Sequence, residues 1–308
     1  MQVSGKAVFI TGASGFIGRR LVTSLLQQNY TVRALVRPGN LPDERIPSGC
    51  EQLAGDLTDT ALLSEVVAES AAVIYCAGTV RGRNIDDFAS ANIDGVKALV
   101  DAFNLSARKP PVLLLSSLAA SRPQVSDYAN SKYQGEQIIR KALDMPWTIL
   151  RPPAVYGPGD KEMLPVLKMI RRVLLAHAGP RNQRLSLLHV DDLVSAINTW
   201  LSAPGKCLHQ SYAIDDGTVG GYDWNAIGHA VSDKAFRVVR LPGALLKASA
   251  AINLQLSKLF GYAPMLSPGK ARELVQADWL GDNSSFSQAT GWQPDLDLKQ
   301  GAQQLFET

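Results

Sequence analysis

The sequence predicts an α/β fold in which a doubly wound parallel sheet is followed by a smaller C-terminal lobe. Three observations support this expectation. Short apolar runs alternate with longer segments of helical periodicity in the first half of the chain, which is the pattern of successive βαβ units. A glycine-rich turn lies between the first of these runs and the first helical segment. Beyond Arg151 the alternation ends in a segment rich in proline and glycine.

The two periodicities place the individual elements. Strands are expected at residues 7–11, 31–36, 51–54, 72–76, 112–116 and 148–150. The intervening segments carry apolar residues three and four positions apart, so helices are expected at residues 16–28, 59–69, 88–106 and 126–143. Helices of this kind cover both faces of a parallel sheet.

The change of pattern after Arg151 sets the expected domain boundaries. Residues 1–151 are expected to form the first domain, and residues 152–308 mainly the second lobe. The segment at about 185–215 is expected to return to the first domain, because residues 189–201 have the pattern of a sheet-flanking helix.

Composition and charge exclude several classes of protein. Hydrophobic residues make up 46% of the chain and charged residues 19%, which is typical of a compact globular protein. The net charge is only +3, and lysine and arginine are spread along the chain, so we expect no nucleic-acid partner. The three cysteines lie far apart and form no CxxC pair, so neither a disulfide framework nor a bound metal is expected.

Nothing in the sequence indicates secretion or a membrane span. The chain passes from Met1 almost directly into an apolar strand, without a signal-peptide pattern, and we therefore expect a cytoplasmic protein. The longest apolar stretch, at residues 241–262, is interrupted by Lys247 and Lys258 and fails as a transmembrane segment. We interpret it as a lid or as a helix that lines a substrate pocket.

The turn after the first strand has the sequence TGASGFIG. Gly12 permits a sharp turn, Gly15 allows backbone N–H groups to approach a pyrophosphate, and Gly18 lets the helix lie close to the sheet. A strand, such a turn and an amphipathic helix in succession predict a dinucleotide-binding Rossmann domain. The residues expected to hold the cofactor here are Gly12, Ser14, Gly15, Phe16, Ile17 and Gly18.

The end of the second strand indicates which dinucleotide is bound. A carboxylate there would accept hydrogen bonds from the ribose diol of NAD(H), but residues 34–38 include none. Arg37 can instead contact a 2′-phosphate, which favours NADP(H) over NAD(H), although a merely solvated arginine is the alternative. Arg33 is the weaker candidate. After the fourth strand, Ala77 and Gly78 suit a close approach of the cofactor, although a tight turn alone also explains Gly78.

Tyr128 and Lys132 form a YxxxK pattern in the helix expected at residues 126–143. Residues four apart lie on one helix face, so the phenol and the ammonium point into one site. A neighbouring ammonium and an oxidised nicotinamide favour phenolate and lower the pKa of a tyrosine towards a range useful for acid–base catalysis. Ser116 and Ser117 end the preceding strand, where a hydroxyl can hold the substrate oxygen that Tyr128 protonates.

These patterns together resemble the extended short-chain dehydrogenases, in particular the NAD-dependent epimerase/dehydratase and 3β-hydroxysteroid-dehydrogenase-like group. The resemblance covers nearly the full chain and rests on the glycine-rich turn, the YxxxK pattern and four further elements. Those elements are Asn92 with Gly95, RPPAVYGPGD at 151–160, LHVDDL at 188–193 and GWQP at 291–294.

The resemblance implies roles for further residues. It implies that Ser117 is the catalytic serine, with Ser116 as its neighbour, and that Asp56 and Leu57 lie beside the adenine. It also implies that the backbone from Pro152 to Val155 meets the nicotinamide carboxamide.

Several residues leave alternatives open. Asp59 competes for the role of the acid after the third strand, as the N-cap of the next helix. Asp191 and Asp192 are expected to cap a helix rather than to bind a metal. Asn92 either distorts its helix or belongs to a proton relay. Arg184 resembles an arginine that faces nucleotide-sugar phosphates, and a salt bridge explains it equally well.

The expected activity is that of an NADP(H)-dependent oxidoreductase. NADPH donates a hydride to a ketone, or a secondary alcohol is oxidised in reverse, while Tyr128 acts as general acid or base, Ser117 orients the oxygen and Lys132 binds the nicotinamide ribose. A small, apolar substrate is expected because residues 241–266 are rich in Leu, Ala and Ile.

Two alternatives to this activity stay open. The first is a nucleotide-sugar epimerase, dehydratase or ketoreductase, although the apolar residues 118–120 count against dehydration. The second is a redox-inactive cofactor-binding sensor or assembly subunit. The oligomeric state is open, with a homodimer as one option.

Overall fold

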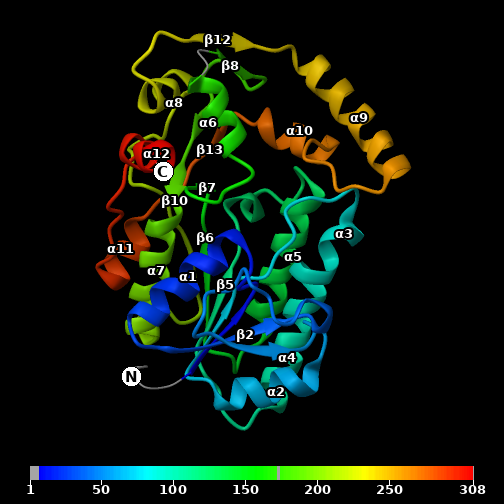
Figure 1. Ribbon diagram of the computed structural model, residues 1–308, viewed down its shortest axis with the longest axis vertical. Coiled ribbons are helices and arrows are strands. Elements are labelled where there is room, and N and C mark those ends of the chain that lie inside the picture. Colours follow the sequence, from blue (N-terminus) through cyan, green and yellow to red (C-terminus); the bar gives the residue numbers. More distant parts are fainter. Residues whose placement is uncertain (1–6, 172–173, 308) are drawn as a thin grey trace.

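A parallel sheet of seven strands forms the centre of the protein in a computed structural model, which describes residues 7–171 and 174–307 (Figure 1). In sheet order the strands are β11 (Gln210–Ala213), β6 (Trp147–Arg151), β5 (Val112–Leu115), β4 (Ala72–Tyr75), β1 (Ala7–Thr11), β2 (Thr31–Val36) and β3 (Glu51–Ala54). Chain order reverses between β1 and β4, and this is the switch point beside which ligands of a doubly wound sheet bind. The predicted fold class is confirmed.

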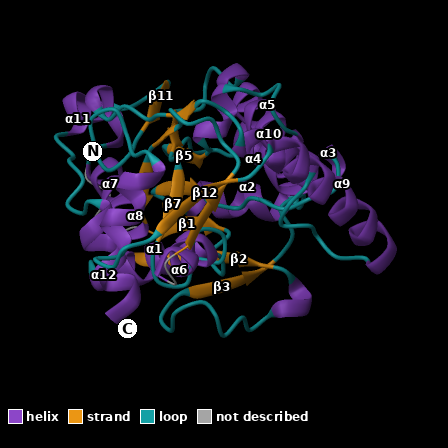
Figure 2. Cartoon of the chain, turned by 90° about the horizontal axis from the view of Figure 1, so that it is seen from above, coloured by secondary structure: helices purple, strands orange, loops and turns teal. Residues whose placement is uncertain are grey.

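Helices cover both faces of this sheet (Figure 2). One face is covered by α1 (Phe16–Gln27) and α7 (Val190–Ser202), and the other by α2 (Thr60–Glu69), α4 (Gly95–Leu105) and α5 (Asp127–Lys141). Successive strand residues point to opposite faces, so Val8 and Ile10 join one hydrophobic core whereas Phe9 joins the other. The central strands β1, β4, β5 and β6 are therefore buried on both sides, whereas the edge strand β3 is not.

The helix expected at residues 88–106 is divided into three parts. The first is α3 (Ile85–Ala89), the second is a π-helical turn at Ser90–Asp94, and the third is α4, which begins at Gly95. The periodicity of apolar residues runs through all three parts, so the sequence pattern gave no sign of the division. A π-helical turn of this kind often accompanies a functional site.

The second lobe lies beyond the carboxyl ends of the strands and has a hydrophobic core of its own (Figure 1). Its strands are β7 (Ala154–Tyr156), β8 (Leu174–His177), β9 (Arg184–Leu185), β10 (Leu187–His189), β12 (Arg237–Arg240) and β13 (Asp278–Trp279). Its helices are α6 (Leu164–Arg171), α8 (Trp224–Val231), α9 (Gly243–Phe260), α10 (Pro268–Leu274) and α12 (Leu298–Glu307). Helix α11 (Ser284–Thr290) packs against the sheet domain, whose core includes Phe286. Between β10 and α8 the chain returns to the sheet domain, to which it contributes α7 and β11.

The apolar stretch interpreted as a lid or pocket helix forms α9, which lies at the outer edge of the molecule (Figures 1 and 2). Within this helix only Ala250 and Ser257 are buried, and Leu254 is the one residue that lines the cavity described below. Most of its apolar side chains face solvent, so the interpretation of the whole stretch as a pocket wall is wrong. Among the residues that the structure describes, no helix is long and apolar enough to cross a membrane.

Candidate active site

The glycine-rich turn joins β1 to α1 at the switch point of the sheet. Gly12 has a φ of +74°, and a Cβ atom there would lie 2.7 Å from the backbone nitrogen of Ala77 at the end of β4. A Cβ on Gly18 would lie 2.1 Å from the carbonyl oxygen of Gly12. The close neighbour of Gly18 is therefore the turn itself rather than the sheet, which corrects the role expected for this residue.

The start of α1 fits an anionic group. Gly15 is the exposed N-cap residue, no side chain caps the first turn, and that turn contains no acidic residue. Phe16 and Ile17 follow as half-buried residues, and Ser14 lies against the carboxylate of Asp43. Because uncapped N–H groups and the helix dipole favour negative charge, this turn suits the diphosphate of a dinucleotide.

Arg37 and Arg33 at β2 have different surroundings. Arg37 is exposed just beyond the strand and makes no ion pair with any described residue, whereas Arg33 forms ion pairs with Glu51 (2.8 Å) and Glu69 (2.5 Å). Arg37 acts through space on Asp56, whose pKa is lowered first by hydrogen bonds from Thr58 and then by this positive charge. Arg37 is thus the arginine that remains available to a ligand.

The acidic cluster after β3 is divided between two local roles. Asp59 caps α2 by accepting a hydrogen bond from the Leu62 N–H at 3.1 Å, as the alternative interpretation of this residue expected. Asp56 is exposed and accepts hydrogen bonds from the N–H and hydroxyl of Thr58. Leu57 is half-buried against the core beneath α2 and α4.

The loop after β4 is held next to Lys132 by Asn92. The Asn92 amide donates to the Thr79 carbonyl at 3.0 Å and to the Ser131 hydroxyl at 2.9 Å, and its oxygen accepts from the Thr79 N–H. A Cβ on Gly78 would lie 2.9 Å from the Lys132 Nζ atom, so Gly78 is required for this close approach. Asn92, which lies in the π-helical turn, therefore links the loop to α5 through these hydrogen bonds.

Lys132 is buried within α5, and its Nζ atom donates to the carbonyl oxygen of Leu115 at 3.2 Å. Burial lowers the pKa of this amine to about 8. At neutral pH the group keeps its charge, and this carbonyl is the one hydrogen-bond acceptor that it has among the described residues. Two further N–H groups are therefore available for a diol or a water molecule.

The two serines after β5 have different partners. The Ser116 hydroxyl donates to the Glu136 carboxylate at 2.6 Å, and this buried carboxylate also accepts from Arg151 at 2.8 Å. The Ser117 hydroxyl caps a short turn by accepting from the Ala119 N–H, and it acts on Tyr128 through a hydrogen bond. Ser116 is therefore committed to the interior, and Ser117 is the serine beside the phenol.

The segment after β6 lies next to this serine. The Pro152 carbonyl accepts a hydrogen bond from the Leu118 N–H at 2.8 Å, and Val155 packs against the core beneath α1 and α7. The backbone expected to meet the nicotinamide is thus joined directly to the turn that carries Ser117.

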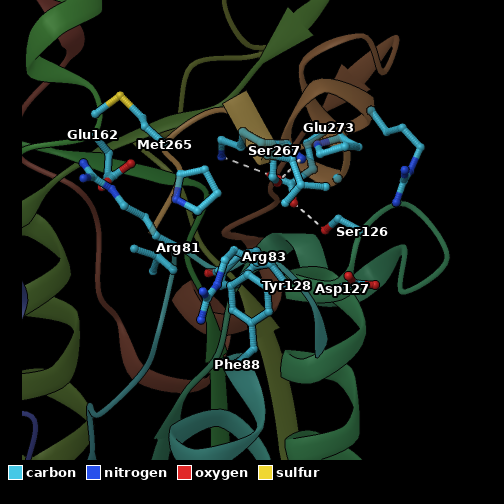
Figure 3. Close-up of a pocket in the computed structure, with 18 residues that line it drawn as sticks. Arg81, Arg83, Phe88, Ser126, Asp127, Tyr128, Glu162, Met265, Ser267 and Glu273 are labelled. Atoms are coloured by element: carbon cyan, nitrogen blue, oxygen red, sulfur yellow. Dashed lines mark hydrogen bonds and ion pairs between the residues drawn. The ribbon is translucent and has the colours of Figure 1, made fainter. Parts of the chain in front are cut away.

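Tyr128 is half-buried in a cavity, with its ring centroid 5.9 Å from that of Phe88 (Figure 3). Burial raises the pKa of Tyr128 to about 12, Ser117 opposes this rise, and the carboxylates of Glu273 and Glu162 add to it. The expected lowering of the pKa by Lys132 is not found. With this raised pKa, the phenol of Tyr128 is protonated at neutral pH when no cofactor is bound.

Polar pairs line this cavity. Arg81 and Glu162 form an ion pair at 2.7 Å, and Glu273 receives hydrogen bonds from Ser126 and Lys270 (Figure 3). These residues come from three separate segments, namely the loop before α3, the start of α5, and the second lobe. The sequence analysis missed them, because no motif links segments that meet only in the folded chain.

The segment LHVDDL at residues 188–193 has structural roles, but they are not the roles that we expected. His189 caps α7, whereas Asp191 forms an ion pair with Arg20 of α1 at 2.7 Å. Asp192 is buried and accepts backbone N–H groups from Asp295 and Leu296, both at 3.0 Å. The expectation that the two aspartates cap the helix is therefore wrong. Within the described residues, no cluster of His, Cys, Asp and Glu side chains could hold a metal ion.

A switch-point turn suited to a diphosphate, together with a tyrosine, a serine and a buried lysine, defines an NAD(P)-dependent enzyme of the short-chain dehydrogenase type. The model of the NAD dependent epimerase/dehydratase family matches residues 8–214, and the chain belongs to this family.

Three known proteins illustrate the relationship. A ceramide reductase from Caulobacter vibrioides (strain NA1000 / CB15N) is 32% identical over 285 residues, which cover 91% of this chain and 88% of the relative. A 4-hydroxy-2-methyl-3-oxo-4-farnesyl-3,4-dihydroquinoline-1-oxide ketoreductase from Stigmatella aurantiaca is 29% identical over 178 residues, or 52% of this chain and 53% of that protein. A UDP-glucuronic acid 4-epimerase from Bacillus cereus, solved with UDP-glucuronic acid and NAD, has the same fold, with a TM-score of 0.71 at 20% identity over 98% of each chain. The chain is accordingly an oxidoreductase or an epimerase that uses a nicotinamide cofactor.

The different partners of Ser116 and Ser117 predict different effects of their removal. Ser117→Ala should lower kcat about 100-fold, because the hydroxyl beside the phenol is lost. Ser116→Ala should leave kcat within about threefold and lower the free energy of unfolding by about 1 kcal/mol. Steady-state kinetics and urea unfolding measure both quantities, and the reverse pattern would assign the catalytic role to Ser116.

Glu136 should be a large contributor to stability. Glu136→Gln leaves Arg151 without its buried counter-charge and should lower the free energy of unfolding by about 3 kcal/mol. The control is Glu69→Gln, which removes a surface partner of Arg33 and should cost at most about 1 kcal/mol. Urea unfolding curves compare the two variants, and equal losses would contradict the structural role of Glu136.

Proposed function

We propose that this protein reduces a ketone with NADPH and that Tyr128 donates the proton. The observation that carries the proposal is the surroundings of Tyr128, because its phenol lines the cavity, is protonated at neutral pH and has the Ser117 hydroxyl beside it. A protonated phenol is the form that a ketone reduction requires, since the developing alkoxide takes up a proton.

The remaining residues of the site support the same step. Ser117 can donate a hydrogen bond to the ketone oxygen and hold it towards Tyr128. Lys132 retains free N–H groups and a positive charge next to Gly78, which suits a ribose diol and stabilises the phenolate after proton transfer. The reduced nicotinamide supplies the hydride when it is bound.

A long-chain keto amide, whose reduction gives an amide lipid of the ceramide class, is the proposed substrate. The support comes from the ceramide reductase of Caulobacter vibrioides, which matches this chain over nearly its whole length. The cavity agrees with such a molecule because Phe88, Leu254 and Met265 offer apolar contacts, while the lining residues Arg81 and Glu162 suit a polar head group.

NADP(H) is the proposed form of the cofactor. Arg37 is exposed beyond β2 without an ion-pair partner among the described residues, and no carboxylate occupies residues 34–38. A guanidinium in that position suits a 2′-phosphate, whereas NAD(H) is usually bound through a carboxylate.

A nucleotide-sugar epimerase is the second candidate, and the shared fold with UDP-glucuronic acid 4-epimerase favours it. Arg184, the residue considered for the sugar phosphates, is 3.5 Å from Asp223 and forms a salt bridge with it. It is not among the residues that line the cavity at Tyr128. This arrangement favours the ketone reductase over the epimerase.

A substrate screen tests the proposed activity. The wild type should oxidise NADPH with keto amides of increasing chain length, and should leave UDP-, GDP- and dTDP-sugars unchanged. Tyr128→Phe should lower kcat by about 10²–10⁴-fold, because the proton donor is lost, with the NADPH dissociation constant nearly unchanged. Activity confined to sugars would establish the epimerase alternative. Turnover by Tyr128→Phe at the wild-type rate would contradict the mechanism, and NADPH binding without any turnover would indicate a redox-inactive protein.

Arg37 should determine cofactor selectivity. Arg37→Ala should weaken NADPH binding about tenfold or more and leave NADH binding nearly unchanged, because a charge-assisted contact to the 2′-phosphate is lost. Arg33→Ala is the matched control, since this arginine already pairs with Glu51 and Glu69. Fluorescence titration measures the dissociation constants, and equal losses for both cofactors in Arg37→Ala would remove Arg37 from the cofactor site.

A further inference from the structure

The outer face of α9 exposes a stripe of apolar side chains. Each of its residues lies three or four positions from another member, so they share one side of the helix. They are Leu245, Ala248, Ile252, Leu256, Leu259 and Phe260, and all are exposed. A surface helix normally turns such a stripe towards the core.

The side of α9 that faces the protein carries small and polar residues together with the half-buried Leu246 and Leu254. Ala250 and Ser257 are buried, and the Asn253 amide donates to the Leu266 carbonyl at 2.8 Å. Tyr262 donates back to Asn253 from the connection that follows the helix. Since these contacts hold the helix in place, the apolar stripe is not needed to fold it.

Basic residues are concentrated around this helix. Residues 234–272 contain seven of the chain's 31 lysines and arginines and none of its 28 aspartates and glutamates. The even spread of basic residues expected from the whole sequence does not hold here. Lys247 and Lys258 lie eleven positions apart, which is about three turns of one helix side, and neither pairs with a described carboxylate.

We propose that the outer face of α9 docks the protein on an anionic membrane surface. An exposed apolar stripe in a segment without acidic residues, with Lys247 and Lys258 exposed together on another side of the same helix, suits a bilayer that contains anionic lipids. A second copy of the chain is a poorer partner, because a two-fold contact would bring the same basic segment against itself.

The docked helix lies next to the proposed catalytic cavity. Leu254, on the side of α9 away from the stripe, lines this cavity together with Pro264 and Met265 of the following connection. A lipid ketone can therefore pass from the bilayer past the end of α9 to Tyr128. This route of entry rests on the proposed function, whereas the docking face rests on exposure and charge alone.

Vesicle flotation tests the docking. The wild type should bind vesicles of phosphatidylcholine with phosphatidylglycerol and bind phosphatidylcholine alone weakly. Leu259→Ser/Phe260→Ser should reduce binding by more than about tenfold, because apolar contact is lost without a change of charge. The matched control is Leu105→Ser/Leu143→Ser, since Leu259 and Phe260 are 74% and 71% exposed and Leu143 and Leu105 are 82% and 71% exposed. This control should bind as the wild type does.

A second pair of variants tests the charge. Lys247→Gln/Lys258→Gln should lower the affinity for phosphatidylglycerol vesicles about 25-fold, at roughly fivefold for each lysine. Lys206→Gln/Lys299→Gln removes the same charge from other exposed positions and should have little effect. The proposal would be overturned if the wild type bound vesicles with and without phosphatidylglycerol equally well. It would also be overturned if the variants of α9 bound as well as their controls. Light scattering that shows a dimer for the wild type and a monomer for Leu259→Ser/Phe260→Ser would assign the face to a second copy.

Turnover separates this inference from the proposed function. The docking variants should reduce a water-soluble short-chain keto amide at the wild-type rate, and should reduce a keto lipid held in phosphatidylglycerol vesicles at least about tenfold more slowly. Vesicle binding without reduction of any ketone would remove the proposed function and leave the docking intact. Reduction of the short-chain ketone without vesicle binding would remove the docking and leave the proposed function intact.

Discussion

The buried carboxylate of Glu136 fixes the geometry on which the rest of the site depends. It lies in α5 and receives hydrogen bonds from Ser116 at the end of β5 and from Arg151 at the end of β6. Tyr128, Lys132 and Glu136 are four residues apart and therefore share one face of α5. The carboxylate thus holds α5 in one register against the ends of both strands. A buried charge that lost its partners would be costly, so this register is strongly specified.

The direction of the proposed chemistry follows from burial. The phenol of Tyr128 stays protonated because desolvation penalises phenolate, while burial brings the pKa of Lys132 down to about 8 without removing its charge near neutrality. A neutral acid beside a retained cation suits proton donation to an alkoxide, and the cation then stabilises the phenolate that remains. The same arrangement serves alcohol oxidation once the phenol has lost its proton at higher pH.

Local patterns predicted the parts of the protein in which neighbouring residues decide the structure. The strands of the sheet, the turn at Gly12 and the shared face of Tyr128 and Lys132 all follow from short-range periodicity or from a glycine at a fixed place. The π-helical turn at Asn92 could not be predicted from periodicity, and the residues to which Asn92 hydrogen-bonds there, Thr79 and Ser131, are distant in the sequence. The apolar content of α9 was recognised in the sequence, but periodicity alone does not say which side of a helix meets the protein.

The central claim is that Tyr128, Lys132 and the Ser117 hydroxyl meet around a nicotinamide whose diphosphate lies on the first turn of α1. A crystal structure of the complex with NADPH tests this most directly. The account predicts the nicotinamide ring between Lys132 and the Pro152–Val155 backbone, with its reactive carbon open towards Tyr128 and the 2′-phosphate next to Arg37. A ring bound elsewhere, or a protein side chain filling that place, would contradict it.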